Sequence, residues 1–294
     1  MSRDSRLLPM DMRMDTKWIL AVMLTGLLAC SGEQSDDPEP MADAPTIQEV
    51  HFTTTDFAFE GPGEIESGMT EFVLTNHGET LHHLQLVKLP EGMSYEDFEA
   101  GMAQMEPGPP PPWFHGVGGV NPPPMHGSAS ATVMVEPGEY AVICLVDTPD
   151  KIPHVMKGMM QPLTVTASSS APAELPPADL QLTLVDYAFS FAQPPTSDVR
   201  TIRVTNTATQ DHEIAIFRIL PGKTMDDVGA WAATFEGPPP FEPIGGVPAI
   251  SPGQSMNFDV DFTPGDYVAL CFIPDAGDGQ LHIEHGMVLP FTIG

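Results

Sequence analysis

Two stretches of the chain are versions of one another: PGEYAVICLVDTPDKIPHVMKGMMQPLTV at residues 137–165 and PGDYVALCFIPDAGDGQLHIEHGMVLPFTI at residues 264–293. Each begins with Pro-Gly, an acidic residue and Tyr, continues as an apolar run that ends in a cysteine, and closes on a histidine, a Gly-Met pair and a second apolar run. The cysteines, Cys144 and Cys271, are 127 positions apart, and the Gly-Met pairs are 128 apart. Features that recur together at a nearly fixed offset indicate an internal repeat.

The repeat extends over nearly all of the chain that follows residue 45. Further equivalent positions lie 127 to 130 residues apart: DFAF at 56–59 with DYAF at 186–189, Asn76 with Asn206, His82 with His212, GGV at 118–120 with GGV at 245–247, and His154 with His282. Between the copies, residues 167–172 are small or polar and end in a proline, a composition that is typical of a linker. We therefore expect one domain at 46–167, a linker at 168–177 and a second domain at 178–294.

Within each copy the pattern is that of a β-protein. Short runs of β-branched and aromatic residues, such as 71–75, 84–87, 131–135 and 140–145, are separated by Gly, Pro and Asn turns. The pattern predicts an all-β fold built as an antiparallel sandwich. One short helix per copy is also expected, because Ser94 with Asp97, and Thr224 with Asp227, can form capping boxes before the segments 98–105 and 228–235.

Each copy also contains one set of side chains suited to a copper ion that cycles between two oxidation states. Such an ion favours a soft thiolate, two imidazoles and a weak axial thioether, because this compromise geometry limits rearrangement on electron transfer. The candidate sets are His82, Cys144, His154 and Met159 in the first copy, and His212, Cys271, His282 and Met287 in the second.

This arrangement resembles the cupredoxin family, whose first histidine ligand follows an Asn-containing turn and whose Cys, His and Met ligands come from one later loop. The turn is matched by NHGETLH at 76–82, and the loop and last strand by Pro153-His154, Gly158-Met159 and PLTV at 162–165. The resemblance implies two tandem cupredoxin-like Greek-key β-sandwiches, one copper ion per domain, and electron transfer rather than catalysis.

The spacing of the closing loop departs from that family. Blue copper proteins usually hold the Cys and the second His a few residues apart, whereas nine residues separate Cys144 from His154 and ten separate Cys271 from His282. The sequence therefore does not decide the coordination geometry of the copper sites.

Several neighbouring residues compete for the ligand positions. Strand alternation places His82 on the inward face with the apolar residues that follow it, and predicts that His83 points outward. The repeat aligns His285 with a lysine, so His285 is not expected to be a ligand. The same comparison excludes Met156 and Met160 as axial ligands.

The sequence leaves three functions open. The first is single-electron transfer. The second is copper storage, delivery or resistance, favoured by extra soft donors in the first copy, namely Met102, Met105, His115, Met125, His126, Met156 and Met160. The third is a metal-free cupredoxin-fold interaction module with buried cysteines that act as small hydrophobic residues. Oxidase and nitrite reductase chemistries are disfavoured, because no histidine adjoins either cysteine and the chain has no His-x-His pair.

The N-terminus reads as a targeting segment. Four basic residues precede an apolar run at 18–29 that is too short to span a bilayer, and the run ends in LLAC at 27–30. LLAC resembles the lipobox of bacterial lipoproteins, which implies a signal peptide at 1–29, a lipidated Cys30 and an acidic tether at 30–45. An ordinary cleaved signal with an incidental cysteine is the alternative. Ser31, rather than Asp, after Cys30 favours the outer membrane, facing the periplasm.

The charge of the chain restricts its partners. Eleven Lys and Arg face 40 Asp and Glu, for a formal net charge of −29. Binding to nucleic acid requires a basic surface, so no nucleic-acid partner is expected. An acidic surface instead favours a basic redox protein, such as a cytochrome c or a copper enzyme. Contact with a membrane is expected only through the N-terminal lipid.

Overall fold

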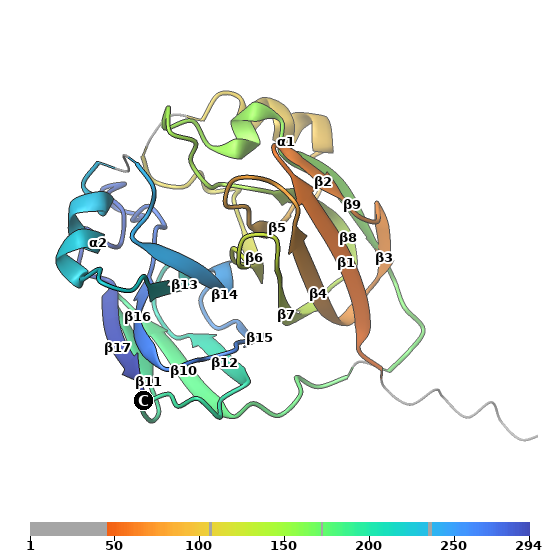
Figure 1. The fold of residues 1–294 in the computed structure, drawn as a ribbon. Helices are drawn as coiled ribbons and strands as arrows, with labels where there is room; N and C mark the ends of the chain where they lie inside the picture. Colours follow the sequence, from red (N-terminus) through yellow and green to blue (C-terminus); the bar gives the residue numbers. More distant parts are fainter. Residues whose placement is uncertain (1–45, 106–107, 172, 235–236) are drawn as a thin grey trace, which may run out of the picture. The chain divides into compact units, whose positions relative to one another are not determined.

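Short strands make up most of the chain in the computed structural model, which describes residues 46–105, 108–171, 173–234 and 237–294 (Figure 1). The expected signal peptide, Cys30 and the tether lie outside these residues. All described residues belong to one compact unit. The fold is all-β and cupredoxin-like, as the sequence predicts. It is not wholly antiparallel, because the strands Gln48–Thr55 and Gly68–Asn76 pair in parallel, as do Leu180–Val185 and Thr201–Asn206.

The first half of the unit contains nine strands among its described residues, and one α-helix and one 3-10 helix. They are β1 (Gln48–Thr55), β2 (Ala58–Glu60), β3 (Glu64–Glu66), β4 (Gly68–Asn76), β5 (Leu84–Lys88), α1 (Tyr95–Met102), β6 (Gly116–Val120), β7 (Ser128–Val135), β8 (Gly138–Ile143), η1 (His154–Lys157) and β9 (Met160–Thr166).

The second half repeats this order, except that its described residues have no counterpart of β3 or η1. Its described elements are β10 (Leu180–Val185), β11 (Ala188–Phe191), β12 (Thr201–Asn206), β13 (His212–Ile219), α2 (Met225–Ala232), β14 (Phe241–Ile250), β15 (Ser255–Asp259), β16 (Gly265–Leu270) and β17 (Val288–Ile293). No described strand or helix lies in the expected linker. The division into two domains stays a prediction, because the two halves share their sheets.

Two sheets run through both halves. One has the strand order β11-β10-β12-β15-β7-β4-β1-β2, and the other has the order β17-β16-β13-β14-β6-β5-β8-β9-β3. The halves meet where β7 pairs antiparallel with β15 and where β6 pairs antiparallel with β14, and Figure 1 shows β6 and β14 side by side. In the first of these junctions Ala131 lies opposite Phe258, and in the second Val117 lies opposite Ile250.

The core between the sheets is also shared. One cluster of buried side chains contains Phe52, Phe72 and Tyr140 from the first half and Phe258 and Tyr267 from the second. Alternating burial along β4 and β12 follows from the inward and outward alternation of side chains in a strand. The continuous sheets and core fix the positions of the loops at the strand ends, where the candidate ligands lie.

The two helices begin where their capping boxes predict. Ser94 caps α1 and Thr224 caps α2, and each cap side chain accepts the backbone N–H three residues on, Asp97 or Asp227. Both helices begin three residues before the segments expected from the sequence, because the three residues that follow each cap already form the first turn, and both also end three residues earlier. Among the described residues, no helix has the length and apolar character needed to cross a membrane.

Replacing Thr224 with alanine is expected to lower the free energy of unfolding by about 1 kcal/mol, because the first-turn N–H of Asp227 loses its acceptor. Chemical denaturation followed by circular dichroism measures the change. Thr209→Ala removes a hydroxyl that bonds Asp186 outside any helix and serves as the comparison. An unchanged unfolding midpoint for Thr224→Ala would contradict the capping role.

Candidate metal centres

In the first half, three donors converge from three separate segments. His82 lies just before β5, Cys144 directly follows β8, and His154 begins η1. The Nδ1 atom of His154 lies 3.0 Å from Nδ1 of His82 and 3.5 Å from Sγ of Cys144. All three side chains are buried, and their donor atoms lie within 4.8 Å of one another.

The second half builds the same arrangement. Sγ of Cys271 lies 3.3 Å from Nδ1 of His282 and 3.9 Å from Nδ1 of His212. These side chains are buried, and their donor atoms again lie within 4.8 Å of one another. We call the two groups the first centre (His82, Cys144, His154) and the second centre (His212, Cys271, His282).

An asparagine at the end of a strand shapes the turn that brings the first histidine of each centre into place. Asn76 ends β4; its Oδ1 accepts the N–H of Gly78 at 2.8 Å, and its Nδ2 donates to the carbonyl of Thr80 at 2.8 Å. Asn206 at the end of β12 makes the equivalent bonds to Ala208 and Gln210, each at 2.9 Å. The amide replaces the backbone partners that the chain loses when it leaves the sheet.

The long spacing between Cys and His is taken up by a small side turn. An isolated bridge joins Asp147 to Pro153 in the first half, and another joins Pro274 to Leu281 in the second. Beyond the bridge, the N–H of His154 bonds the carbonyl of Val146 at 2.9 Å. The bridge closes the extra residues into a side turn, so that the histidine beyond it lies next to the cysteine.

Met159 and Met287 are fully buried on the same loops. Their backbone N–H groups donate to the carbonyls of His154 and His282 at 3.0 and 2.9 Å. The preceding residues, Gly158 and Gly286, have φ of 96° and 92°, a left-handed conformation that favours glycine. Each methionine is therefore buried on the loop that carries the second histidine, and ligation by the thioether stays a prediction.

An aspartate that the sequence pattern did not assign lies behind the first histidine of each centre. Nε2 of His82 donates to Oδ1 of Asp56 at 3.1 Å, and Nε2 of His212 donates to Oδ1 of Asp186 at 2.8 Å. Such a carboxylate fixes the tautomer, leaves Nδ1 free to bind a metal and increases its basicity. Both aspartates stand in the repeated DFAF and DYAF stretches, so the repeat contained the signal.

The residue after each first histidine faces the cysteine. The N–H of His83 points to Sγ of Cys144 at 3.4 Å, and Nε2 of His83 accepts the N–H of Leu145 at 2.7 Å. The prediction that His83 points outward is therefore wrong. His82 and His83 precede β5, and strand alternation does not apply to residues outside a strand.

The second half places a glutamate at the same position. The N–H of Glu213 points to Sγ of Cys271 at 3.5 Å, and Oε1 of Glu213 accepts the N–H of Phe272 at 2.6 Å. Burial lowers the pKa of His83 to about 3 and raises the pKa of Glu213 to about 7. The two halves thus support their cysteines with the same geometry but different chemical groups.

An aromatic ring covers the second histidine of each centre. The Phe57 ring meets the His154 ring edge-on at 5.0 Å, and the Tyr187 ring meets the His282 ring at 5.2 Å. His285 stacks on the Tyr187 ring at 4.7 Å and is not among the donors of the second centre. These rings thus pack directly against the buried histidines.

The donors fit a soft or borderline metal ion. One thiol and two imidazoles per centre are ligands that copper accepts, and the burial of all three restricts access by water. Burial raises the pKa of the Cys144 thiol to about 12, and it lowers the pKa values of His154 and His282 to about 4. The imidazoles are thus neutral and able to bind, and a bound cation would deprotonate the thiol.

A third group of possible donors, Asp275, Asp278 and His285, is explained by the loop that it braces. Oδ2 of Asp275 accepts from the Tyr187 hydroxyl at 2.6 Å and from Gln210 at 2.9 Å. Its Oδ1 accepts the N–H groups of Gly277 and Asp278 at 2.8 and 3.0 Å. These bonds lower the pKa of Asp275 and occupy both oxygens.

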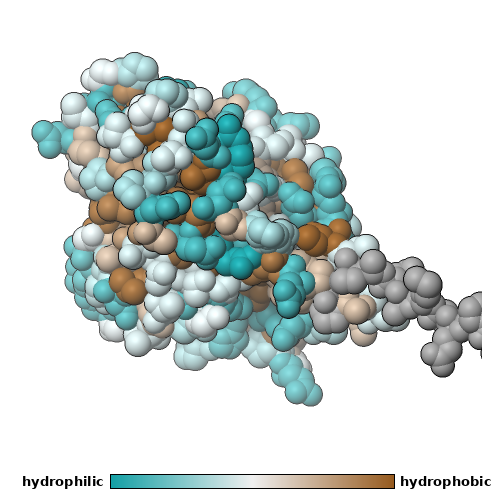
Figure 2. Space-filling model, turned by 90° about the horizontal axis from the view of Figure 1, so that it is seen from below, coloured by the Kyte–Doolittle hydropathy of each residue, from teal (hydrophilic) through white to brown (hydrophobic). Residues whose placement is uncertain are grey.

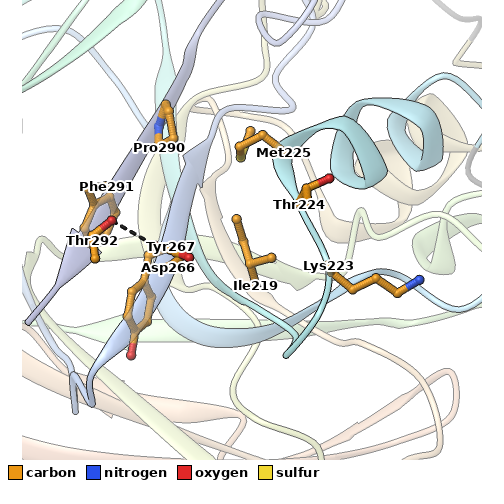
Figure 3. Close-up of a pocket in the computed structure, with 9 residues that line it drawn as sticks. All are labelled: Ile219, Lys223, Thr224, Met225, Asp266, Tyr267, Pro290, Phe291 and Thr292. Atoms are coloured by element: carbon orange, nitrogen blue, oxygen red, sulfur yellow. Dashed lines mark hydrogen bonds between the residues drawn. The ribbon is translucent and has the colours of Figure 1, made fainter.

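Figure 3 shows a shallow pocket that belongs to neither centre. It lies between α2, β16 and β17, with Ile219, Met225 and Tyr267 among its lining side chains, and one edge is closed by a bond from Thr292 to Asp266 at 2.8 Å. The pocket is at the start of β16, whereas Cys271 follows the end of that strand.

No known protein family and no curated protein matches the sequence. Among solved structures, the chain is similar to a reduced auracyanin from the photosynthetic bacterium Roseiflexus castenholzii, at 21% identity and a TM-score of 0.28 over 39% of this chain and 94% of that one. It is also similar to a blue copper oxidase from Nitrosomonas europaea (16% identity, TM-score 0.25, 84% and 86% covered) and to a copper nitrite reductase from the same organism (12%, 0.23, 85% and 94%).

Proposed function

We propose that this cupredoxin-like chain is an exported copper protein that binds one copper ion in each half and carries single electrons. The observation that carries the proposal is the convergence of one thiol and two imidazole Nδ1 atoms, in the same arrangement, at two equivalent places. Met159 and Met287 are the proposed axial ligands, and the chain is proposed to act as a carrier rather than as a catalyst.

When bound, copper supplies the one-electron redox couple. The chain's own residues hold its surroundings constant. Asp56 and Asp186 orient the first histidines, the N–H groups of His83 and Glu213 point at the thiolate sulfurs, and Phe57 and Tyr187 exclude water. A rigid, dry and pre-formed set of donors limits rearrangement when the charge of the ion changes.

The partner is proposed to be a basic redox protein, such as a cytochrome c or a copper enzyme, because 40 acidic residues face only 11 basic ones. The face in Figure 2 is mostly hydrophilic or neutral, with separate hydrophobic areas. We further propose that lipidation at Cys30 anchors the chain to the bacterial outer membrane, on the periplasmic side. Electrostatic attraction to the partner weakens as ionic strength rises.

Titrating the full chain with Cu(II) tests the proposal. An intense thiolate-to-copper charge-transfer band that saturates at two ions per chain and bleaches reversibly on reduction supports it. Absence of stoichiometric copper binding in either oxidation state would leave the metal-free interaction module.

Copper storage or delivery is the second candidate function, and Met125 and Met156 favour it because each is 39% exposed. The other methionines in the proposed donor set give less support: Met102 is fully buried, and Met105 and Met160 pack against the same core cluster. Binding of more than two Cu(I) ions per chain without the charge-transfer band would favour storage.

Replacing Asp186 with alanine is expected to lower the copper affinity of the second centre about 10- to 100-fold, because the His212 ring loses the acceptor at its Nε2. Competition with a copper chelator measures the affinity. Asp186→Asn keeps an acceptor oxygen and should give an intermediate value. Asp179→Ala removes a carboxylate that accepts only the backbone N–H groups of Arg200 and Thr201. This variant should leave the copper affinity of the second centre unchanged. Equal affinities for all three variants would rule out the role of Asp186.

A further inference from the structure

Three buried polar side chains lie between the two centres. They are His83 from the first half, Glu213 from the second, and Asn121, which follows β6 at the junction of the halves. Burying an amide, an imidazole and a carboxylic acid is unfavourable unless each one is hydrogen-bonded. Each of the three buried side chains therefore requires hydrogen-bond partners.

His83 is attached to the first centre at two points. Its backbone N–H faces Sγ of Cys144 at 3.4 Å, and its Nε2 accepts the N–H of the next residue, Leu145, at 2.7 Å. With Nε2 as the acceptor, Nδ1 carries the proton in the neutral ring. The side chain of Asn121 is the further hydrogen-bond partner of this ring.

Glu213 is attached to the second centre in the same way. Its N–H faces Sγ of Cys271 at 3.5 Å, and its Oε1 accepts the N–H of Phe272 at 2.6 Å. Its other oxygen, Oε2, lies 3.4 Å from Nδ2 of Asn121. Asn121 also donates to the carbonyls of Ile214 and Val247 at 2.9 and 3.0 Å, which fixes the amide across the junction.

These contacts form one buried chain from sulfur to sulfur: Cys144, His83, Asn121, Glu213, Cys271. The contacts from each sulfur to the neighbouring backbone N–H, and from Glu213 to Asn121, are hydrogen bonds of 3.4 to 3.5 Å. The Asn121 side chain is also the partner of the His83 ring, and all five residues are buried. Electron tunnelling falls off more slowly along covalent and hydrogen bonds than across gaps between packed atoms, and a low local dielectric strengthens the hydrogen bonds.

We propose that this chain of residues, with Asn121 as its shared link, is the path by which an electron passes between the two centres inside one molecule. The inference rests on the proposed copper binding in both halves. One electron leaves the reduced centre of one half and arrives at the oxidised centre of the other. No bond breaks, no proton moves and no further reactant is required.

The test uses the full chain loaded with two copper ions and Asn121→Leu, which removes the link. A radiolytic pulse delivers less than one electron per molecule, and absorbance follows its redistribution between the centres. In the wild type we expect a redistribution phase whose rate does not depend on protein concentration. Asn121→Leu should slow that phase about tenfold or more, by analogy with the loss of other outer partners of metal ligands.

Gln85→Leu is the matched control. Gln85 is also a buried amide at the junction of the halves and bonds the carbonyls of Gly118 and Ala249, each at 3.2 Å, but it is outside the chain of five residues. Electron redistribution in Gln85→Leu should be as fast as in the wild type. Equal rates for Asn121→Leu and wild type, with two copper ions bound in both, would overturn the path while leaving the proposed function intact. Failure of wild type to bind copper would overturn both.

A measurement on the metal-free protein covers the case in which Asn121→Leu binds copper poorly. Hydrogen exchange of the Leu145 and Phe272 amides reports whether His83 and Glu213 are still held in place. We expect faster exchange at both amides in Asn121→Leu and in the milder variant Asn121→Ala, and no change in Gln85→Leu. Unchanged exchange in both Asn121 variants would contradict the shared link.

Discussion

Replacing Cys144 with serine is expected to abolish copper binding by the first centre and to leave the second centre intact. The Sγ atom is the one soft anionic donor among the three grouped in that centre, and a serine hydroxyl is hard and stays protonated near neutral pH. The full chain should therefore bind one copper ion instead of two, and its charge-transfer band should fall to the contribution of the second centre. Cys271→Ser should give the complementary result.

Metal analysis and absorption spectra of the two single variants and the double variant measure these losses. The double variant should be colourless. Cys30→Ser is the control, because it removes the one other cysteine of the sequence, which lies outside the described residues. Two bound copper ions in Cys144→Ser, or colour in the double variant, would show that the donors are assigned wrongly.

The second large effect concerns stability. Phe258→Ala is expected to lower the free energy of unfolding by about 3–5 kcal/mol, because a large side chain that is 1% exposed leaves a cavity in the core. Since that core contains residues of both halves, the first half should lose as much stability as the second. Both halves should unfold in one transition.

Denaturation followed by the fluorescence of Trp113, in a background that carries both Trp18→Phe and Trp231→Phe, reports on the first half. We expect Phe258→Ala to lower the midpoint seen by this distant probe. Val185→Ala, a change at the exposed C-terminal end of β10 in the second half, should alter stability by no more than about 0.5 kcal/mol. A Trp113 signal that keeps its midpoint in Phe258→Ala would mean that the halves unfold independently.

The repeat explains why the ligands could be found in the sequence. One copy alone offers several candidate donors. Comparison with the first copy excludes His285 as a ligand, because its counterpart there is Lys157. The structure groups His82, Cys144 and His154 in the first half and their equivalents in the second. The sequence also predicts the helix caps, because a capping box depends on residues only three positions apart.

What the sequence did not reveal depends on contacts between distant segments. Asp56, in the turn between β1 and β2, reaches His82 just before β5; the repeat marks this aspartate, but the local pattern of neither segment encodes the contact. His83 was misplaced because periodicity applies within a strand and not to the turn before it. The pairing of β7 with β15 depends on two edges that both look like ordinary strands in the sequence.

The register at the junction of the halves has a further consequence. Ala131 lies opposite Phe258, and these two residues occupy the same place in the repeat, 127 positions apart. A strand that meets its own counterpart in antiparallel register is the signature of an isologous, twofold-symmetric interface. The single chain thus has the geometry of a fused homodimer, and a half produced alone would present unpaired strand edges that a second copy of itself can cover.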